Sequence, residues 1–86
     1  MFGTGQPVTR AQAVTFLWRQ AGSPPPVGRN PFTDVAGGRY YSDAVIWAFE
    51  QGVTTGMSPV MFGPDFPVTR VQFAAFLSRY DKLGLN

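Results

Sequence analysis

Two arginines occupy the same position in two copies of one short motif. The sequence T-R-A-Q at residues 9–12 and T-R-V-Q at residues 69–72 each precede a stretch with helical spacing. A threonine followed three residues later by glutamine is a capping box, in which the two side chains bond otherwise unpaired backbone amides at a helix start. Arg10 and Arg70 therefore fall at the first helical position, where a cation opposes the helix dipole at a cost of roughly 0.3–1 kcal/mol.

A negatively charged ligand would explain why this unfavourable choice occurs twice. A carboxylate or phosphate could accept hydrogen bonds from the guanidinium and from free amides at the helix start together. The alternative is that each arginine pairs with a nearby acid, such as Asp34 or Asp65, or reaches solvent. On the anion hypothesis, Arg10→Ala abolishes ligand binding and preserves the helices.

The residue types needed for catalysis or metal binding are scarce. The chain has no Cys and no His, which excludes disulfides and removes the usual general base and commonest metal ligand. No pattern in the sequence places two carboxylates together in a cleft, as a glycosidase would require. We therefore expect no enzyme activity, no cofactor and no metal site.

Composition restricts the class of protein further. A length of 86 residues indicates one small domain, and an aromatic content of 15% helps so short a chain to build a core. A net charge of +2 with scattered arginines argues against a nucleic-acid partner. No apolar run suits membrane insertion, and no signal peptide is visible after Met1. The chain starts in the middle of a repeat, so we expect it to be a piece of a longer protein.

The two motifs belong to a longer internal repeat. Residues 2–19 recur as residues 62–79 with more than half of their positions identical, so both copies should adopt the same local structure. Each copy has apolar residues at helical i, i+3, i+4 spacing, which predicts one helix per copy. The first helix is expected to end near Gly22 and the second near residues 82–84. The apolar stripes are Ala13, Phe16, Leu17 and Ala21 in the first copy, and Phe73, Phe76, Leu77 and Tyr80 in the second.

A third helix is expected between the two copies. A proline-rich connector at about residues 22–31 should be extended, and a Gly-Gly turn follows at 37–38. The helix is predicted from Tyr41 to Gln51, with Ser42 or Tyr41 as its cap and Gly52 as its stop signal. Residues 53–56 predict a short strand or turn. The fold class is thus all-α, with three main helices, long irregular loops and at most a two-residue strand pairing.

Four segments together resemble the S-layer homology family: PFTDV at 31–35, YYSDAVIWAFEQGVTTG at 40–56, MFGPDFPVTRVQ at 61–72 and FLSR at 76–79. The resemblance implies a complete repeat at residues 32–86, the second half of a preceding repeat at 1–22, and a connector at 23–31. It also implies an extracellular module that binds pyruvylated or phosphorylated secondary cell-wall polysaccharide. Family repeats commonly occur in threes, as a pseudo-threefold helical bundle with grooves between neighbours. A homo-oligomer could complete such a bundle here.

The family's T-R-A-E motif corresponds to residues 9–12 and 69–72, with glutamine in place of glutamate. Gln12 and Gln72 lack the negative charge but keep the capping hydrogen bond, and the effect on ligand choice stays open. Val71 adds bulk beside Arg70. The resemblance makes both arginines and both glutamines candidate ligand-binding residues.

Three further residues have two interpretations each. Trp47 could stack on a sugar ring or pack in the core. Asp34 could accept from sugar hydroxyls or cap a turn. Gly56 could admit a ligand close to the backbone or serve a positive-φ turn. The glycan hypothesis predicts that these three residues and Arg10 line one groove.

Aromatic residues elsewhere favour structural roles. Trp18 is expected in the core or at a repeat interface, and Tyr40 and Tyr41 against the start of the middle helix. The alternative function is a structural self-association or protein-interaction module with no glycan ligand, because an incomplete repeat leaves an apolar face uncovered.

Overall fold

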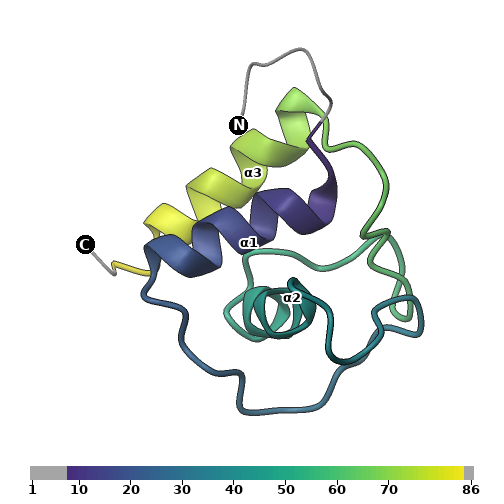
Figure 1. Cartoon of the computed structure of the whole chain (residues 1–86). Helices are drawn as coiled ribbons and strands as arrows, with labels where there is room; N and C mark the ends of the chain where they lie inside the picture. Colours follow the sequence, from purple (N-terminus) through teal and green to yellow (C-terminus); the bar gives the residue numbers. More distant parts are fainter. Residues whose placement is uncertain (1–7, 85–86) are drawn as a thin grey trace.

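The computed structural model describes residues 8–84, which form three helices joined by long loops (Figure 1). Helix α1 spans Arg10–Gln20, α2 spans Ser42–Glu50 and α3 spans Arg70–Asp81. The prediction of an all-α fold with three main helices is confirmed, and the middle helix is one residue shorter at each end than expected. None of the helices described is both long and apolar enough to cross a membrane.

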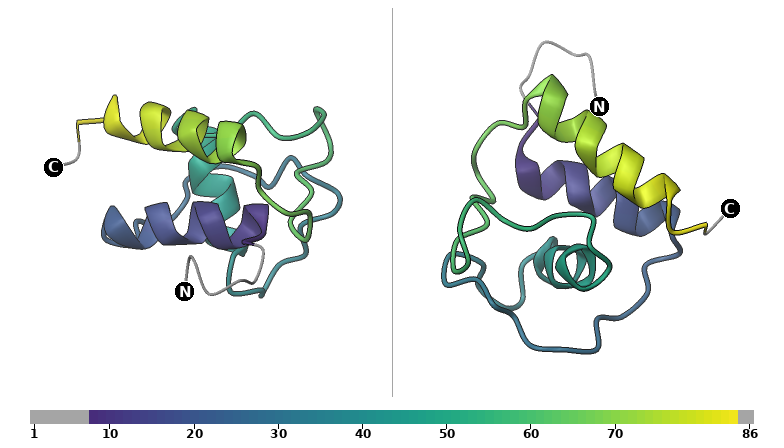
Figure 2. Two further views of the ribbon diagram at one scale, coloured as in Figure 1. Left: turned by 90° about the horizontal axis from the view of Figure 1, so that it is seen from above. Right: turned by 180° about the vertical axis from the view of Figure 1, so that it is seen from behind.

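Helix α1 is the centre of the arrangement, because it packs against both α2 and α3. The two repeat helices, α1 and α3, lie side by side and run in the same direction (Figures 1 and 2). Helix α2 crosses that direction and is seen along its axis in Figure 1. The loops on either side of α2 wrap one end of this group.

Both repeat helices begin with the predicted capping box. The Thr9 hydroxyl accepts from the Gln12 amide at 3.1 Å, and the Gln12 side chain accepts from the Thr9 amide at 2.9 Å. The pair Thr69 and Gln72 repeats these bonds at 3.1 and 3.0 Å. The local sequence therefore decides where both helices start.

The segments that lead into α1 and α3 pair with each other. An isolated antiparallel bridge joins Thr9 to Pro67, and the Val68 amide donates to the Val8 carbonyl at 2.7 Å. This short contact is the small strand pairing expected from the sequence. Residues 53–56 follow an irregular path instead of forming a strand.

The start of α2 is fixed by Ser42. Tyr41 stands at the N-cap position but its side chain makes no capping bond. The Ser42 hydroxyl accepts from the Arg39 amide at 2.9 Å and donates to the Ala36 carbonyl at 2.5 Å. These bonds close the glycine-rich turn before the helix. Tyr40 and Tyr41 meet edge to face, with Tyr41 half-buried and Tyr40 exposed.

The connector between α1 and α2 is attached at two points. The Trp18 indole donates to the Pro24 carbonyl at 2.7 Å, which uses a half-buried tryptophan to hold the first prolines. Further along, the Glu50 carboxylate accepts from the amides of Val27 and Gly28. The connector, residues 22–31, therefore lies across the C-terminal end of α2, and we call it the strap.

The core gathers residues from all three helices and both long loops. Phe62 is fully buried, and its ring packs 5.6 Å from that of Phe32 between centroids. The buried cluster consists of Ala13, Val14, Leu17, Phe32, Val35, Ala44, Val45, Trp47, Ala48, Val53, Phe62, Phe76 and Tyr80. Phe62 is the largest fully buried side chain and comes from a loop, so the loops are part of the core.

One predicted core position of the second copy is wrong. Leu77 is 41% exposed, whereas its counterpart Leu17 is 2% exposed. The same contrast holds for Val71 at 80% and Ala11 at 1%. Helix α1 packs closely against both other helices, whereas α3 packs closely against α1 and meets α2 through the ring of Tyr80. The side of α3 with Val71 and Leu77 therefore faces solvent, although Phe76 and Tyr80 are buried.

We expect Phe62→Ala to lower the free energy of unfolding by about 3–5 kcal/mol, because it leaves a cavity under the loop. Phe66→Ala is the matched control, since Phe66 is from the same loop and is 53% exposed; it should cost less than about 1 kcal/mol. Urea unfolding followed by circular dichroism measures both. Equal losses would show that Phe62 is not a central core residue.

Candidate functional site

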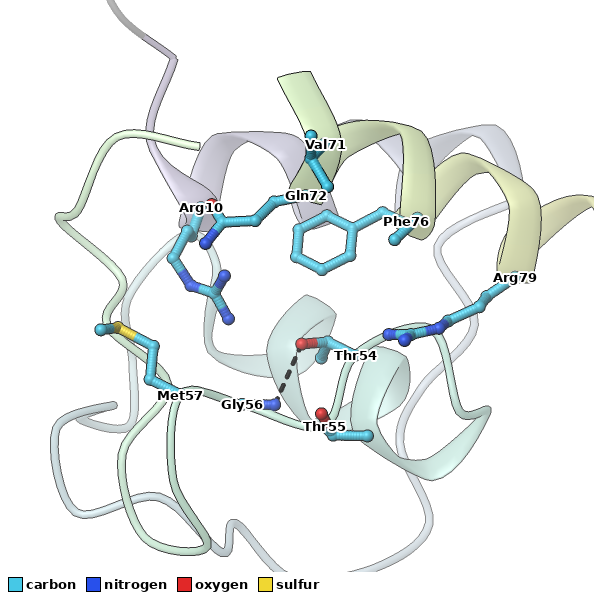
Figure 3. A pocket seen from close by; sticks show the side chains of 10 residues that line it. Arg10, Thr54, Thr55, Gly56, Met57, Val71, Gln72, Phe76 and Arg79 are labelled. Atoms are coloured by element: carbon cyan, nitrogen blue, oxygen red, sulfur yellow. Dashed lines mark hydrogen bonds between the residues drawn. The ribbon is translucent and has the colours of Figure 1, made fainter. Parts of the chain in front are cut away.

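A cavity of about 250 Å³ opens between the start of α1, the loop after α2 and one face of α3 (Figure 3). We call it the Arg10 pocket. It is lined by Arg10, by loop residues 54–57, and by Val71, Gln72, Ala75, Phe76 and Arg79 of α3. The lining combines two guanidinium groups, hydroxyl and amide groups and one aromatic ring, and it contains no carboxylate.

Arg10 is held rigidly at one end of the pocket. Its side chain is only 4% exposed, and its Nε donates to the Phe62 carbonyl at 2.8 Å. The guanidinium carbon lies 4.8 Å from the Phe62 ring centroid and 5.5 Å from that of Phe76. Both distances are within the range of cation–π attraction. The two rings and the carbonyl therefore fix the plane of the guanidinium.

The terminal nitrogens of Arg10 have no hydrogen-bond partner among residues 8–84. Nε is the one guanidinium nitrogen that bonds within the part of the chain described, and the terminal nitrogens point into the pocket (Figure 3). They are not among the buried polar atoms that lack a partner, so solvent in the pocket reaches them. An anion in the pocket could replace this solvent and accept hydrogen bonds from these nitrogens.

Asp34 lies outside the pocket, so its predicted place in the groove is wrong. One of its oxygens accepts from the Phe62 amide at 2.9 Å and the other from the Gly63 amide at 2.8 Å. It therefore fixes the turn that presents the Phe62 carbonyl to Arg10. Burial lowers the pKa of Arg10 and the negative charge of Asp34 raises it. An arginine does not lose its proton in proteins, so the pocket keeps its positive charge.

Trp47 also lies outside the pocket, and its predicted place at the rim is wrong. It is buried on α2, and its ring packs against that of Tyr80 with 6.5 Å between centroids. This corresponds to the core-packing alternative. The physical reason is that the Tyr80 end of α3 covers the side of α2 on which Trp47 lies.

Gly56 does line the pocket, and its backbone has φ of +82°. A Cβ at this position would lie 2.6 Å from Cε1 of Phe32. Its amide donates to the Thr54 hydroxyl at 3.1 Å (Figure 3). The positive φ that we considered is confirmed, and the close approach is to a core aromatic ring, so Gly56 shapes the pocket wall.

The two motif arginines lie in different surroundings. Arg70 is exposed and is not part of the pocket lining. At the start of α1 the Arg10 and Ala11 amides donate to the carbonyls of Phe66 and Pro64, at 2.8 and 3.1 Å. The expectation that free amides at this helix start would join the arginine in holding an anion is therefore wrong. The guanidinium alone remains available.

The two motif glutamines differ in the same way. Gln72 is half-buried in the pocket lining, whereas Gln12 is exposed outside it. The structure thus brings together Arg10, Gly56 and Gln72. Sequence reasoning missed Arg79 and Phe76, which lie on the same face of α3 as Gln72. Phe76 follows Gln72 by four residues and Arg79 follows it by seven. This helical spacing was a signal that could have placed them on one face.

Comparison with known proteins identifies a family for a segment that includes part of the pocket lining. Residues 31–74 match the family model for the S-layer homology domain. A cell surface protein from Thermoanaerobacter kivui is 41% identical over 49 residues, which is 57% of this chain and 6% of that protein. The chain therefore spans only a small part of this curated relative. No solved structure shows significant similarity to this chain.

We expect Gly56→Ala to destabilise the fold by about 1–3 kcal/mol more than Gly52→Ala. Both glycines have positive φ, at +82° and +78°, but nothing lies within 4 Å of a Cβ added to Gly52. The difference between the two variants in thermal unfolding reports the close contacts of the added Cβ with the Phe32 ring and the Ser58 carbonyl oxygen. Equal destabilisation would mean that φ alone requires glycine at this wall.

Proposed function

The chain belongs to the S-layer homology family, and we propose that its Arg10 pocket binds an acidic group of a secondary cell-wall polysaccharide. The family consists of non-catalytic modules that anchor proteins at the cell surface. The pyruvylated or phosphorylated polymer expected from the sequence is the finer part of this proposal. A pyruvyl ketal carboxylate and a phosphate each supply the negative oxygens that the pocket lacks.

The observation that carries the proposal is a largely buried arginine whose terminal nitrogens have no partner among the described residues and open onto a cavity. Arg10 is held by Phe62 and Phe76, so its terminal nitrogens are presented in a fixed plane. A planar guanidinium suits bidentate bonding to a carboxylate or phosphate. Because the arginine is preorganised, less conformational entropy is lost when the anion binds.

The rest of the lining suits a sugar that carries such a group. The side chains of Thr55 and Gln72 bring a hydroxyl and an amide to the pocket, and these can bond sugar hydroxyls. The Phe76 ring supplies an apolar surface against the hydrophobic side of a sugar. Gln72 stands where the family motif has glutamate, so the lining holds no negative charge to repel an acidic polymer.

We further propose the repeat boundaries predicted from the sequence. Residues 32–86 form a complete repeat, residues 1–22 the second half of a preceding one, and residues 23–31 the connector. The identical capping boxes of α1 and α3 support this division. On these boundaries the pocket lies between the two repeats, since Arg10 belongs to the first and the other lining residues to the second.

We expect Arg10→Gln and Arg10→Lys each to weaken binding to purified wall polysaccharide at least about tenfold. A hydrogen bond to a charged group contributes about 1.5–3 kcal/mol, and 1.4 kcal/mol corresponds to tenfold. Lysine keeps the charge but loses the bidentate geometry. Microscale thermophoresis or a sacculus pull-down, with and without removal of the secondary polymer, measures the effect.

Arg70→Gln is the matched control, because it changes the same motif position and the same charge outside the pocket. It should keep parental affinity within about twofold. Circular dichroism must show that the Arg10 variants are folded, since they remove the bond to the Phe62 carbonyl. Parental affinity in a folded Arg10→Gln protein would refute the proposed site.

Self-association is a second candidate function, and the exposed side of α3 that carries Val71 and Leu77 favours it. The equivalent stripe of α1 is buried, as the pairs Ala11 and Val71 or Leu17 and Leu77 show. A second copy of the repeat could cover α3 as α1 is covered within the chain, and would complete a homo-oligomer. Exposed apolar residues along one helix face are suited to such contacts.

Leu77→Glu tests this candidate without altering the pocket, whose lining does not include Leu77. If copies associate through α3, the parent protein should increase in mass with concentration in light scattering, and the variant should remain a monomer. Burying a glutamate at such an interface is unfavourable unless it is paired. A parent that is monomeric at high concentration would contradict self-association.

A further inference from the structure

The second guanidinium of the pocket is not explained by binding a single acidic group. We propose that Arg79 is a second anion-binding residue, and that the preferred ligand presents two negatively charged groups along α3. This inference rests on the proposed function and makes the ligand class more specific. Arg10 would hold one group and Arg79 the other, with the Phe76 ring between them (Figure 3).

The spacing along α3 separates the two cations. Gln72 lies beside Arg10 in the pocket, and Arg79 lies at the opposite end (Figure 3). Seven residues separate Gln72 from Arg79, which is about 10 Å along a helix. Arg10 cannot move towards Arg79 without losing the Phe62 carbonyl and both rings. Two separate acidic groups therefore fit the pocket better than one that is shared.

Arg79 is weakly held and can turn to a ligand. It is exposed, and one of its terminal nitrogens donates to the Val53 carbonyl at 3.4 Å. This is longer than the usual 2.7–3.2 Å for such bonds, so it is easily exchanged for a bond to an anion. A charge-assisted bond to a carboxylate or phosphate is roughly twice as strong as a neutral one.

The repeat provides an internal comparison for Arg79. Arg19 occupies the equivalent position in the last turn of α1, where a cation also meets the favourable end of the helix dipole. Arg19 is exposed and lies outside the pocket lining. The dipole explains an arginine at both positions, but only Arg79 has the pocket in front of it.

The test compares two synthetic N-acetylhexosamine oligosaccharides of equal length, one with a single pyruvyl ketal and one with two. Isothermal titration calorimetry gives the affinity of the parent protein and of Arg79→Gln, Arg79→Lys and Arg19→Gln. The parent should bind the doubly charged ligand at least about tenfold more tightly. Arg79→Gln should weaken the doubly charged ligand far more than the singly charged one and so remove this preference.

Arg79→Lys should retain most of the preference, because the charge persists, and Arg19→Gln should behave as the parent. Equal weakening of both ligands by Arg79→Gln, or no weakening of either, would overturn the role of Arg79. So would equal affinity of the parent for the two ligands, with Arg10 still required. If the parent bound neither ligand, the proposed function itself would fail.

Discussion

The structure depends on the contact between the first turn of α1 and the loop that contains Phe62. Asp34 holds the loop from one side by accepting from two consecutive amides. Arg10 holds it from the other side, through the Phe62 carbonyl and ring. Two backbone amides of α1 also donate hydrogen bonds to carbonyls of this loop. Loop, helix start and core are thus fixed together, and the pocket forms where Arg10 leaves this contact.

One residue therefore serves both the core and the surface. An arginine can do this because its guanidinium has several donors in a plane, so Nε can be used internally and the terminal nitrogens externally. A lysine carries its three donors on one nitrogen, so it has no separate nitrogens in a plane to face the carbonyl and the pocket. This explains why a cation is tolerated at the unfavourable end of a helix dipole: the loop carbonyls accept from the same helix start and the aromatic faces attract its charge.

The local structure was readable from the sequence, and the long-range contacts were not. The capping boxes place α1 and α3 because their chemistry involves residues only three positions apart. The roles of Asp34 and Trp47 depend on partners twenty-eight or more residues away, and for these the groove prediction failed.

Arg10 and Arg70 have the same local sequence, yet one is buried and the other exposed, because only α1 is covered by a loop. The family resemblance drew attention to the arginine motif but gave no means to separate its two copies. Arg79 was missed because its position opposite Arg10 appears only after α1 and α3 pack together.

The strap between α1 and α2 makes the covalent link between these two helices separable from the contacts that hold them together. Its residue Val27 is 96% exposed, and exposed loops are preferred sites of proteolysis. The contacts that hold α1 in place come from α2, α3 and the Phe62 loop, all of which follow the strap in sequence. A single cut near Val27 would therefore yield two peptides that stay together under native conditions. They would separate only on denaturation, so the segment with α1 would behave as a non-covalently bound subunit of its own chain.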